Sequence, residues 1–137
     1  MYSRGRRDVG GNAVLLGSVA QRIFNVAHCP VLSVSPRARR ALGADQKFAK
    51  ILYPSDFSEY YWRLNALVPP EARTWCRSDA LVSVGDPAQA IPQAAWEQNA
   101  DLIVLSAHRA AGTFNVPLTT AYQVVAHAPC PVLRVRC

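Results

Sequence analysis

Residues 15–34 read LLGSVAQRIFNVAHCPVLSV, and they contain the unit that decides the fold of this chain. Apolar residues recur at helical spacing after Ser18, whose side chain is expected to cap the helix. Pro30 prevents the helix from continuing, and residues 31–34 then have the apolar composition of a buried strand. The stretch therefore predicts one amphipathic helix followed by one strand.

The same unit occurs near the other end of the chain. Residues 119–135 read TTAYQVVAHAPCPVLRV and match residues 18–34 without a gap. In this match Cys29 and Cys130 both precede the tripeptide Pro-Val-Leu, and we interpret both as small buried hydrophobic residues. An internal repeat changes how the whole fold is interpreted, because each copy represents one structural unit.

Between the two units the sequence alternates between strand and helix patterns. We expect strands at 48–53, 79–84 and 101–106, and a helix at about 88–99 in which Pro92 is tolerated only in the first turn. This alternation predicts a doubly wound, mostly parallel α/β sheet that binds ligands at the carboxyl ends of its strands.

The repeat divides the chain into three segments. We interpret residues 1–36 as the loop, helix and strand that end a first repeat, with a basic loop over residues 1–14. Residues 37–47 are expected to be a linker with a helical turn, and residues 48–137 a shortened second repeat.

Composition excludes several classes of protein. The chain has 137 residues, a formal net charge of +6 and four cysteines without a Cys-x-x-Cys pair, so neither a zinc site nor a disulfide framework is expected. No apolar run approaches the roughly 20 residues of a membrane helix, and no signal core follows the basic N-terminus, so we expect a cytoplasmic protein without membrane contact. The arginines cluster in segments expected to be exposed loops, which makes nucleic-acid binding the weakest alternative.

Several motifs resemble the universal stress protein family. Residues 50–59, KILYPSDFSE, resemble the opening strand and loop of these domains, and residues 84–87, VGDP, resemble their mid-domain turn. Residues 101–108, DLIVLSAH, resemble their fourth strand, and both Cys-Pro-Val-Leu units resemble their closing strand. The resemblance implies a five-stranded α/β sheet in a stress-response module that binds ATP or a related adenine nucleotide without being an enzyme.

The family's phosphate loop follows the pattern Gly-x2-Gly-x9-Gly-[Ser/Thr]. Gly5, Gly17 and Ser18 match it in the first copy, whereas Tyr2 replaces its first glycine and the spacer is two residues longer. The second copy has lost all three glycines and has a spacer one residue shorter; its corresponding residues run from Ser106 through His108 to Arg109, and then Leu118 and Thr119.

The resemblance also implies roles for residues at the strand ends. Asp56 corresponds to the acid that faces adenine or ribose, and its alternative role is a helix N-cap. Pro54 and Ser55 would line the same pocket through their backbones. The residues that would contact phosphate are His108, Arg109, Thr119 and Thr120, and the two threonines are alternatively a helix cap.

Two further expectations follow from the resemblance. Only two residues separate Glu59 from the region that resembles a later helix, so the first helix and second strand of a full domain are expected to be missing. Family members pair their final strands antiparallel, which implies a homodimer, or, within this chain, pairing of residues 31–35 with 132–135 as an extra antiparallel edge strand. Three functions remain open: a weak adenine-nucleotide-binding module, an interaction module that has lost nucleotide binding, and an Arg-dependent nucleic-acid binder.

Overall fold

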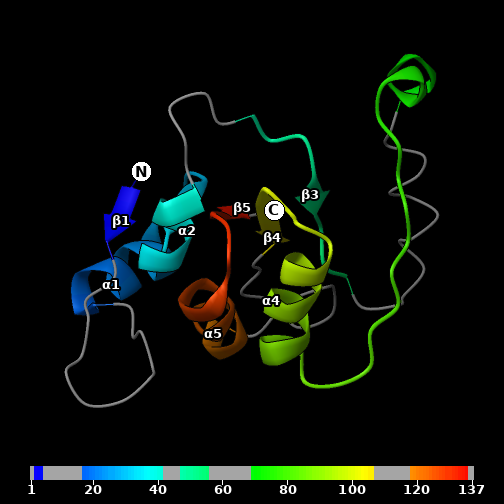
Figure 1. The fold of residues 1–137 in the computed structure, drawn as a ribbon. Coiled ribbons are helices and arrows are strands. Elements are labelled where there is room, and N and C mark those ends of the chain that lie inside the picture. The colour runs from blue at the N-terminus through cyan, green and yellow to red at the C-terminus, as the bar shows by residue number, and fades with distance from the viewer. Residues whose placement is uncertain (1, 5–16, 42–46, 56–68, 107–117, 136–137) are drawn as a thin grey trace.

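The computed structural model describes residues 2–4, 17–41, 47–55, 69–106 and 118–135 (Figure 1). The elements, in chain order, are β1 (Tyr2–Arg4), α1 (Ser18–Val26), β2 (Val31–Val34), α2 (Pro36–Ala41), β3 (Ile51–Leu52), the 3₁₀ helix η1 (Pro70–Thr74), α4 (Pro87–Glu97), β4 (Leu102–Ser106), α5 (Leu118–His127) and β5 (Val132–Val135). The strands form one sheet in the order β1-β2-β5-β4-β3. Every neighbouring pair is parallel except β2 and β5, which confirms the mostly parallel α/β fold.

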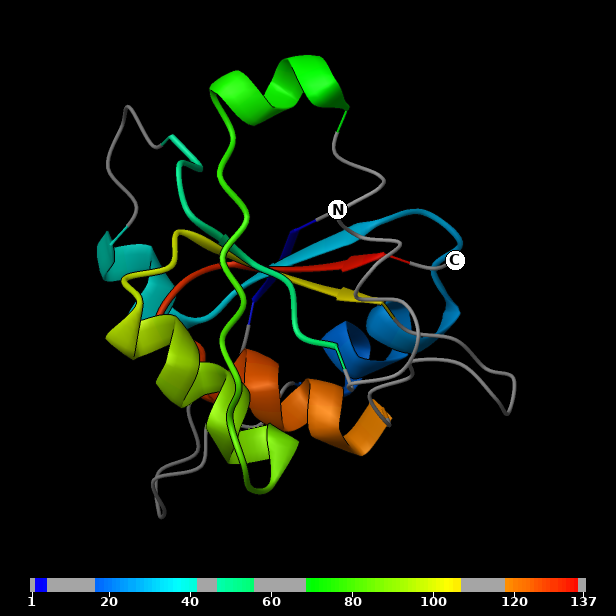
Figure 2. The same cartoon turned by 90° about the vertical axis from the view of Figure 1, so that its right-hand side faces the viewer.

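The core lies between the sheet and the helices α1, α4 and α5, which cover the same face (Figure 2). Phe24 of α1, Ile103 of β4 and Val124 of α5 are completely buried there. Val31 of β2 and Val132 of β5 belong to the same core, so the segment around α1 packs as part of this domain rather than as an appendage.

The pairing of β2 with β5 is confirmed as predicted. Leu32 pairs with Leu133, Val31 with Arg134, and Ser33 with Val132. The gapless match of the two sequence units also superposes Leu32 on Leu133, so the register is symmetric about this pair of leucines.

Each unit also contributes a side chain to the helix end of the other unit. Arg134 of β5 donates a hydrogen bond from one guanidinium nitrogen to the Ala27 carbonyl, at 2.8 Å, and another from its second terminal nitrogen to the Phe24 carbonyl, both at the end of α1. Ser35, which follows β2, donates to the Ala128 carbonyl at the end of α5, at 3.2 Å. The last carbonyls of a helix have no hydrogen-bond donor within the helix, and burying them without a partner costs free energy. The two reciprocal sets of bonds supply the missing donors.

Two expectations about the first 47 residues are wrong, the loop over residues 2–4 and the Ser18 cap. Residues 2–4 form β1, which pairs parallel with β2, so a part of the expected N-terminal loop is a strand and β2 is not the outermost strand. This pairing is favourable because, without β1, the backbone N–H and C=O groups along the outer edge of β2 would have no strand to bond. The helical turn expected in the linker, residues 37–47, is present as α2, which begins at Pro36; the Ser35 hydroxyl accepts a hydrogen bond from the Ala38 amide at its start. Ser18 is the first residue of α1 and makes no capping bond, because Gly17 occupies the N-cap position.

Two expectations about the middle of the chain are also wrong. Residues 79–84 have a strand composition but form no strand, and all six are exposed. Strand propensity expresses packing against a neighbouring strand, and no strand of the described residues pairs with this segment. Pro92 is not confined to the first turn of α4 but lies inside the helix, where it is buried and removes one backbone hydrogen bond.

Asp101 attaches the short strand β3 to the rest of the sheet. One of its carboxylate oxygens accepts hydrogen bonds from the backbone amides of Ala49, at 3.0 Å, and Lys50, at 2.8 Å. The Asp101 amide in turn donates to the Lys50 carbonyl, at 2.8 Å. These bonds hold the start of β3 beside the start of β4, although β3 has only two paired residues.

Replacing Asp101 by Ala is expected to lower the free energy of unfolding by about 1–2 kcal/mol, because two backbone donors lose a charged acceptor at a solvent-exposed position. Urea unfolding measures this loss. Hydrogen exchange at the Lys50 amide should become faster in the variant than in the unchanged protein, and by more than at the Ile103 amide, which bonds the Pro131 carbonyl. Glu97→Ala, which removes an exposed carboxylate from α4, is the matched control and should change stability by less than about 0.5 kcal/mol. Equal stability of both variants would contradict the role of Asp101.

Candidate nucleotide site

Part of the predicted site is brought together at the carboxyl ends of β3 and β4. Pro54 and Ser55 follow β3 after one intervening residue, and Ser106 ends β4. Because Leu52 pairs with Ile103 in parallel register, the residues after β3 leave the sheet on the same side as Ser106. Pro54 and Ser106 are half-buried, and Ser55 is exposed. This end of the sheet is where α/β folds bind ligands.

The N-terminus of α5 lies at the same end of the sheet. α5 runs back from the carboxyl side of β4 to the start of β5, so Thr119 and Thr120 in its first turn lie on the side of Ser106. Thr120 is half-buried, and no acidic residue occupies the first turn. Backbone amides and the helix dipole favour an anion at such a position.

Gly17 and Ser18 lie at the opposite end of the sheet. They begin α1, which runs back to the start of β2, and β2 is antiparallel to β5. The structure therefore separates this half of the predicted phosphate loop from the residues that follow β3 and β4. Gly17 has an ordinary φ of −58°, and a Cβ added there would meet no atom within 4 Å, so packing does not require a glycine.

Four of the predicted site residues lie outside the described residues: Gly5, Asp56, His108 and Arg109. Their roles stay predictions. The same is true of the segment after Glu59, where the first helix and second strand of a full domain were expected to be missing.

The two Cys-Pro units differ in burial. Cys130 is only 3% exposed, as predicted, whereas Cys29 is exposed and its predicted burial is wrong. The difference arises because Cys130 lies in the core two residues before the central strand β5, whereas Cys29 lies two residues before β2, whose outer neighbour β1 has only three residues. Burial, and to a smaller extent the charge of Asp101, raises the pKa of Cys130 to about 11.

Thiol labelling should separate the two cysteines. In a protein with Cys137 replaced by Ser, a thiolate-specific reagent at pH 8 is expected to modify Cys29 and Cys76, which are exposed, and to leave Cys130 unmodified until the protein unfolds. Cys130 is protonated at this pH because its pKa is raised, and its burial blocks access. Mass spectrometry of the labelled protein gives the count. Cys29→Ser should remove one label and Cys130→Ser none; fast modification of Cys130 in the folded protein would contradict this assignment.

The histidine at the end of α5 has a structural role. The His127 ring nitrogen Nδ1 lies 2.8 Å from the Gln123 carbonyl, within the same helix. The imidazole therefore contacts a carbonyl in the last turn of α5.

Sequence reasoning missed Arg134 and Asp101, the two side chains with the most consequential polar contacts. Arg134 replaces Ser33 in the match of the two units, and it is a charged residue in an otherwise apolar strand. A charge at an inward position of a central strand requires partners, and that signal would have identified Arg134.

The class of protein follows from this geometry: a single α/β domain whose final strand β5 is covered by a strand from the first part of the same chain. The sequence profile described as "Universal stress protein family" matches residues 64–136, more than half of the chain. The chain belongs to the universal stress protein family and is a stress-response module of that type. Among the helices in the described ranges, none is both long and apolar enough to cross a membrane.

Individual relatives agree with this assignment. A universal stress protein of Thermus aquaticus, named for its position in the 3′ region of a QAH/OAS sulfhydrylase, is 49% identical over 61 residues, which is 44% of each chain. The crystal structure of a universal stress protein from Archaeoglobus fulgidus superposes on 98% of this chain with a TM-score of 0.67 at 15% identity. A functionally unknown protein from Pseudomonas aeruginosa gives a TM-score of 0.56, also at 15% identity. This chain spans 44% of the length of the Thermus relative and 62% of each of the two structures.

Proposed function

We propose that this chain is a non-catalytic stress-response module that binds an adenine nucleotide weakly at the carboxyl ends of β3 and β4. The observation that carries the proposal is the position of Pro54 and Ser55 after β3 and of Ser106 at the end of β4, two adjacent parallel strands, with the N-terminus of α5 at the same end. Adenine would lie against the residues after β3, with Asp56 as its polar partner, and the phosphates near Thr119 and Thr120. The net charge of +6 adds a general attraction for the anion.

Weak binding follows from the position of Gly17 and Ser18. They begin α1 at the other end of the sheet, so they cannot complete the site beside β4. The loop that remains carries Arg109 and Leu118 where the family has glycines, and a Cβ there hinders close approach of backbone amides to phosphate.

Isothermal titration with ATP tests the proposal. We expect saturable binding with a dissociation constant of about 0.1–1 mM, weaker or absent binding of GTP, and weaker binding of tripolyphosphate, which separates adenine recognition from charge. Asp56→Ala should abolish ATP binding, whereas Gly17→Ala, at the opposite end of the sheet, should leave it unchanged. Absence of heat at millimolar ATP, or a loss in Gly17→Ala equal to that in Asp56→Ala, would contradict the proposed site.

A second candidate function is favoured by the pairing of β2 with β5. In this candidate the module has lost nucleotide binding and acts through protein contacts, with the first-repeat remnant covering β5 within the same chain. A homodimer through β5 would require β2 to separate from β5. In this candidate function β5 therefore pairs with β2 of its own chain and not with a second copy. A purified protein that retains stoichiometric adenine nucleotide would exclude this function, and absorbance together with chromatography of the heat-released ligand measures it.

A further inference from the structure

The outer edge of β3 is open in this structure. β3 is the last strand in the sheet order, so within the described residues no strand pairs with its second side. Its surroundings are apolar but poorly covered: Ile51 is 55% exposed, and Phe48 and Tyr53, which flank the strand, are also exposed. An uncovered edge with these side chains can accept a further strand.

The segment Asp79–Val84 is a strand sequence that lacks a partner. Leu81, Val82 and Val84 are exposed, Val84 almost completely at 96%. Residues 81–86 face the surface of α4 across a hollow of about 370 Å³ rather than packing against it. The same sequence therefore holds both an open strand edge and an unpaired strand-forming segment.

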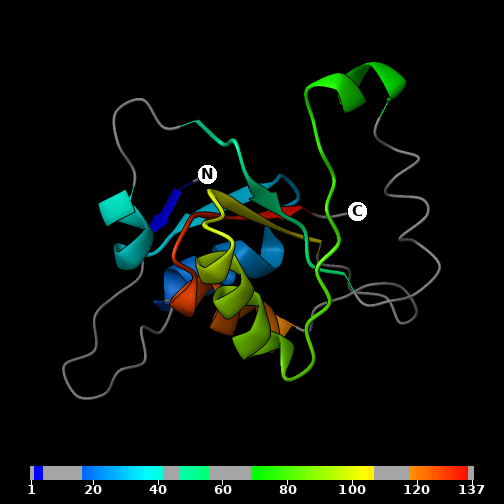
Figure 3. The ribbon, with the colours of Figure 1, turned by 45° about the vertical axis from the view of Figure 1, so that its right-hand side comes forward.

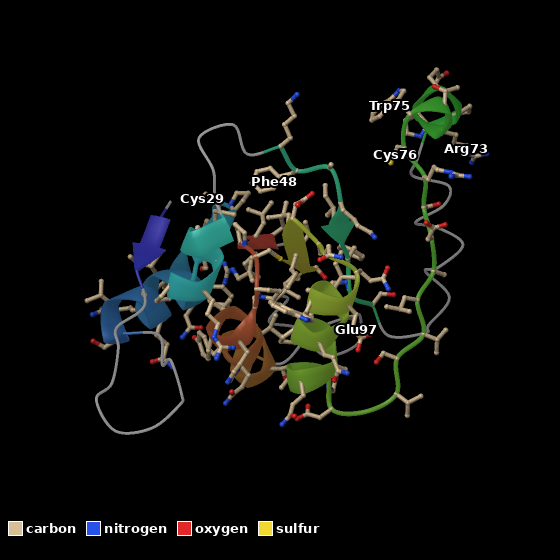
Figure 4. All side chains as sticks on the ribbon, viewed as in Figure 1. Cys29, Phe48, Arg73, Trp75, Cys76 and Glu97 are labelled. Atoms are coloured by element: carbon tan, nitrogen blue, oxygen red, sulfur yellow. The ribbon has the colours of Figure 1, made fainter. Side chains whose placement is uncertain are left out.

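The segment does not pair with β3 of its own chain. Figures 1 and 3 show a gap between it and the outer side of β3, and in Figure 2 it passes in front of β3 on its way from η1 to α4. Gly85 has a φ of +138°, and Asp86 accepts a hydrogen bond from the Ala88 amide at 3.1 Å, so the direction in which the segment leaves α4 is set at this turn. Figure 4 shows Trp75, Cys76 and Arg73 together at η1, far from Phe48 beside β3.

We propose that residues 79–84 of one copy pair with the open edge of β3 in a second copy, and that the exchange is reciprocal. Charge favours this occupant: the β3 edge carries Lys47 and Lys50, and the segment carries Asp79 at its start. Composition favours it too, because the exposed apolar side chains of Leu81, Val82 and Val84 would be covered together with the exposed Ile51. Because each copy donates its segment to the other, one dimer contains two strand pairings. The second pairing forms within an already associated pair, which strengthens the dimer. This surface is the outer edge of β3 rather than the carboxyl ends of β3 and β4, and the inference does not depend on the proposed function.

Light scattering coupled to size exclusion tests the dimer with the full chain. Val82→Pro removes a ladder donor at an exposed position and should raise the dimer dissociation constant at least tenfold. Arg77→Pro, an exposed position of the same loop outside the segment, should leave it unchanged. Lys50→Asp and Asp79→Lys should each weaken the dimer, and the double variant should regain affinity. A protein that is monomeric up to millimolar concentration, or a dimer that Val82→Pro does not weaken, would overturn the proposal.

Disulfide trapping distinguishes pairing between copies from pairing within one chain. In a background with Cys29, Cys76 and Cys137 replaced by Ser, a mixture of Ile51→Cys chains and Val82→Cys chains should give a cross-linked heterodimer under mild oxidation. A control mixture of Ile51→Cys with Val19→Cys chains, the latter exposed on α1, should give none. If only the Ile51→Cys/Val82→Cys double variant forms a disulfide, and does so within one chain, the segment pairs with its own sheet and the proposal is wrong.

Discussion

Replacing Arg134 by Ala is expected to lower the free energy of unfolding by about 3 kcal/mol, because one buried and one partly buried carbonyl at the end of α1 lose their donors and a buried side chain leaves a cavity. Arg134 is 2% exposed, and its guanidinium carbon lies 5.1 Å from the centroid of the Phe24 ring. The positive charge also lies at the C-terminus of α1, where the helix dipole favours it. Urea unfolding followed by circular dichroism measures the loss.

Two comparison variants separate the causes of this loss. Arg134→Met retains much of the volume but not the two hydrogen bonds, so it should cost about 1–2 kcal/mol. Arg22→Ala removes an exposed arginine from α1 and should change stability by less than about 0.5 kcal/mol. If Arg134→Ala were as stable as Arg22→Ala, the reciprocal connection between the two units would contribute nothing to stability.

Replacing Phe24 by Ala is expected to cost about 3–5 kcal/mol, the usual range for a large aromatic residue in a core. Phe24 is 0% exposed and packs across the interface between α1 and α5, with its ring centroid 5.4 Å from that of Tyr122. The variant removes this ring contact and the surface beneath Arg134 together. Thermal and urea unfolding should both show the loss as one cooperative transition, because α1 shares a core with the rest of the sheet.

The control for Phe24 lies on the same helix. Val19→Ala, at a residue 72% exposed, should change stability by less than about 0.5 kcal/mol. A double-mutant cycle of Phe24→Ala with Arg134→Ala should give a coupling of at least about 0.5 kcal/mol, because the two side chains are in contact. Additive losses, or a Phe24→Ala variant in which α1 separates in a transition of its own, would show that residues 17–36 are not part of the domain.

The strongest sequence predictions concerned segments with a period and a stop signal. Residues 101–106 were expected as a strand and residues 88–99 as a helix, and the ends of β4 and α4 differ from these bounds by at most two residues. The resemblance also led to the pairing of β2 with β5. Residues 79–84 failed because a strand is completed by a neighbour, and their apolar composition says nothing about whether a neighbour is present. The opposite error was made for residues 2–4, which were expected to be a loop. They form a strand because the backbone of β2 is available for pairing on that side.

The candidate site was predictable only in part. The sequence placed Pro54, Ser55 and Ser106 at strand ends, and parallel strands bring such ends together. It did not show that Gly17 and Ser18 belong to the other end of the sheet, because that depends on the antiparallel pairing of β2 with β5.

The repeated unit at residues 18–34 and 119–135 was sufficient to predict the helices α1 and α5 and the strands β2 and β5, because helical periodicity and the stop at proline depend on neighbouring residues. How the two repeated units are oriented relative to each other was decided only by the tertiary structure. Antiparallel pairing about Leu32 and Leu133 turns two similar units in opposite directions. That one geometric fact divides the predicted phosphate-loop residues between two ends of the sheet and buries Arg134 against α1.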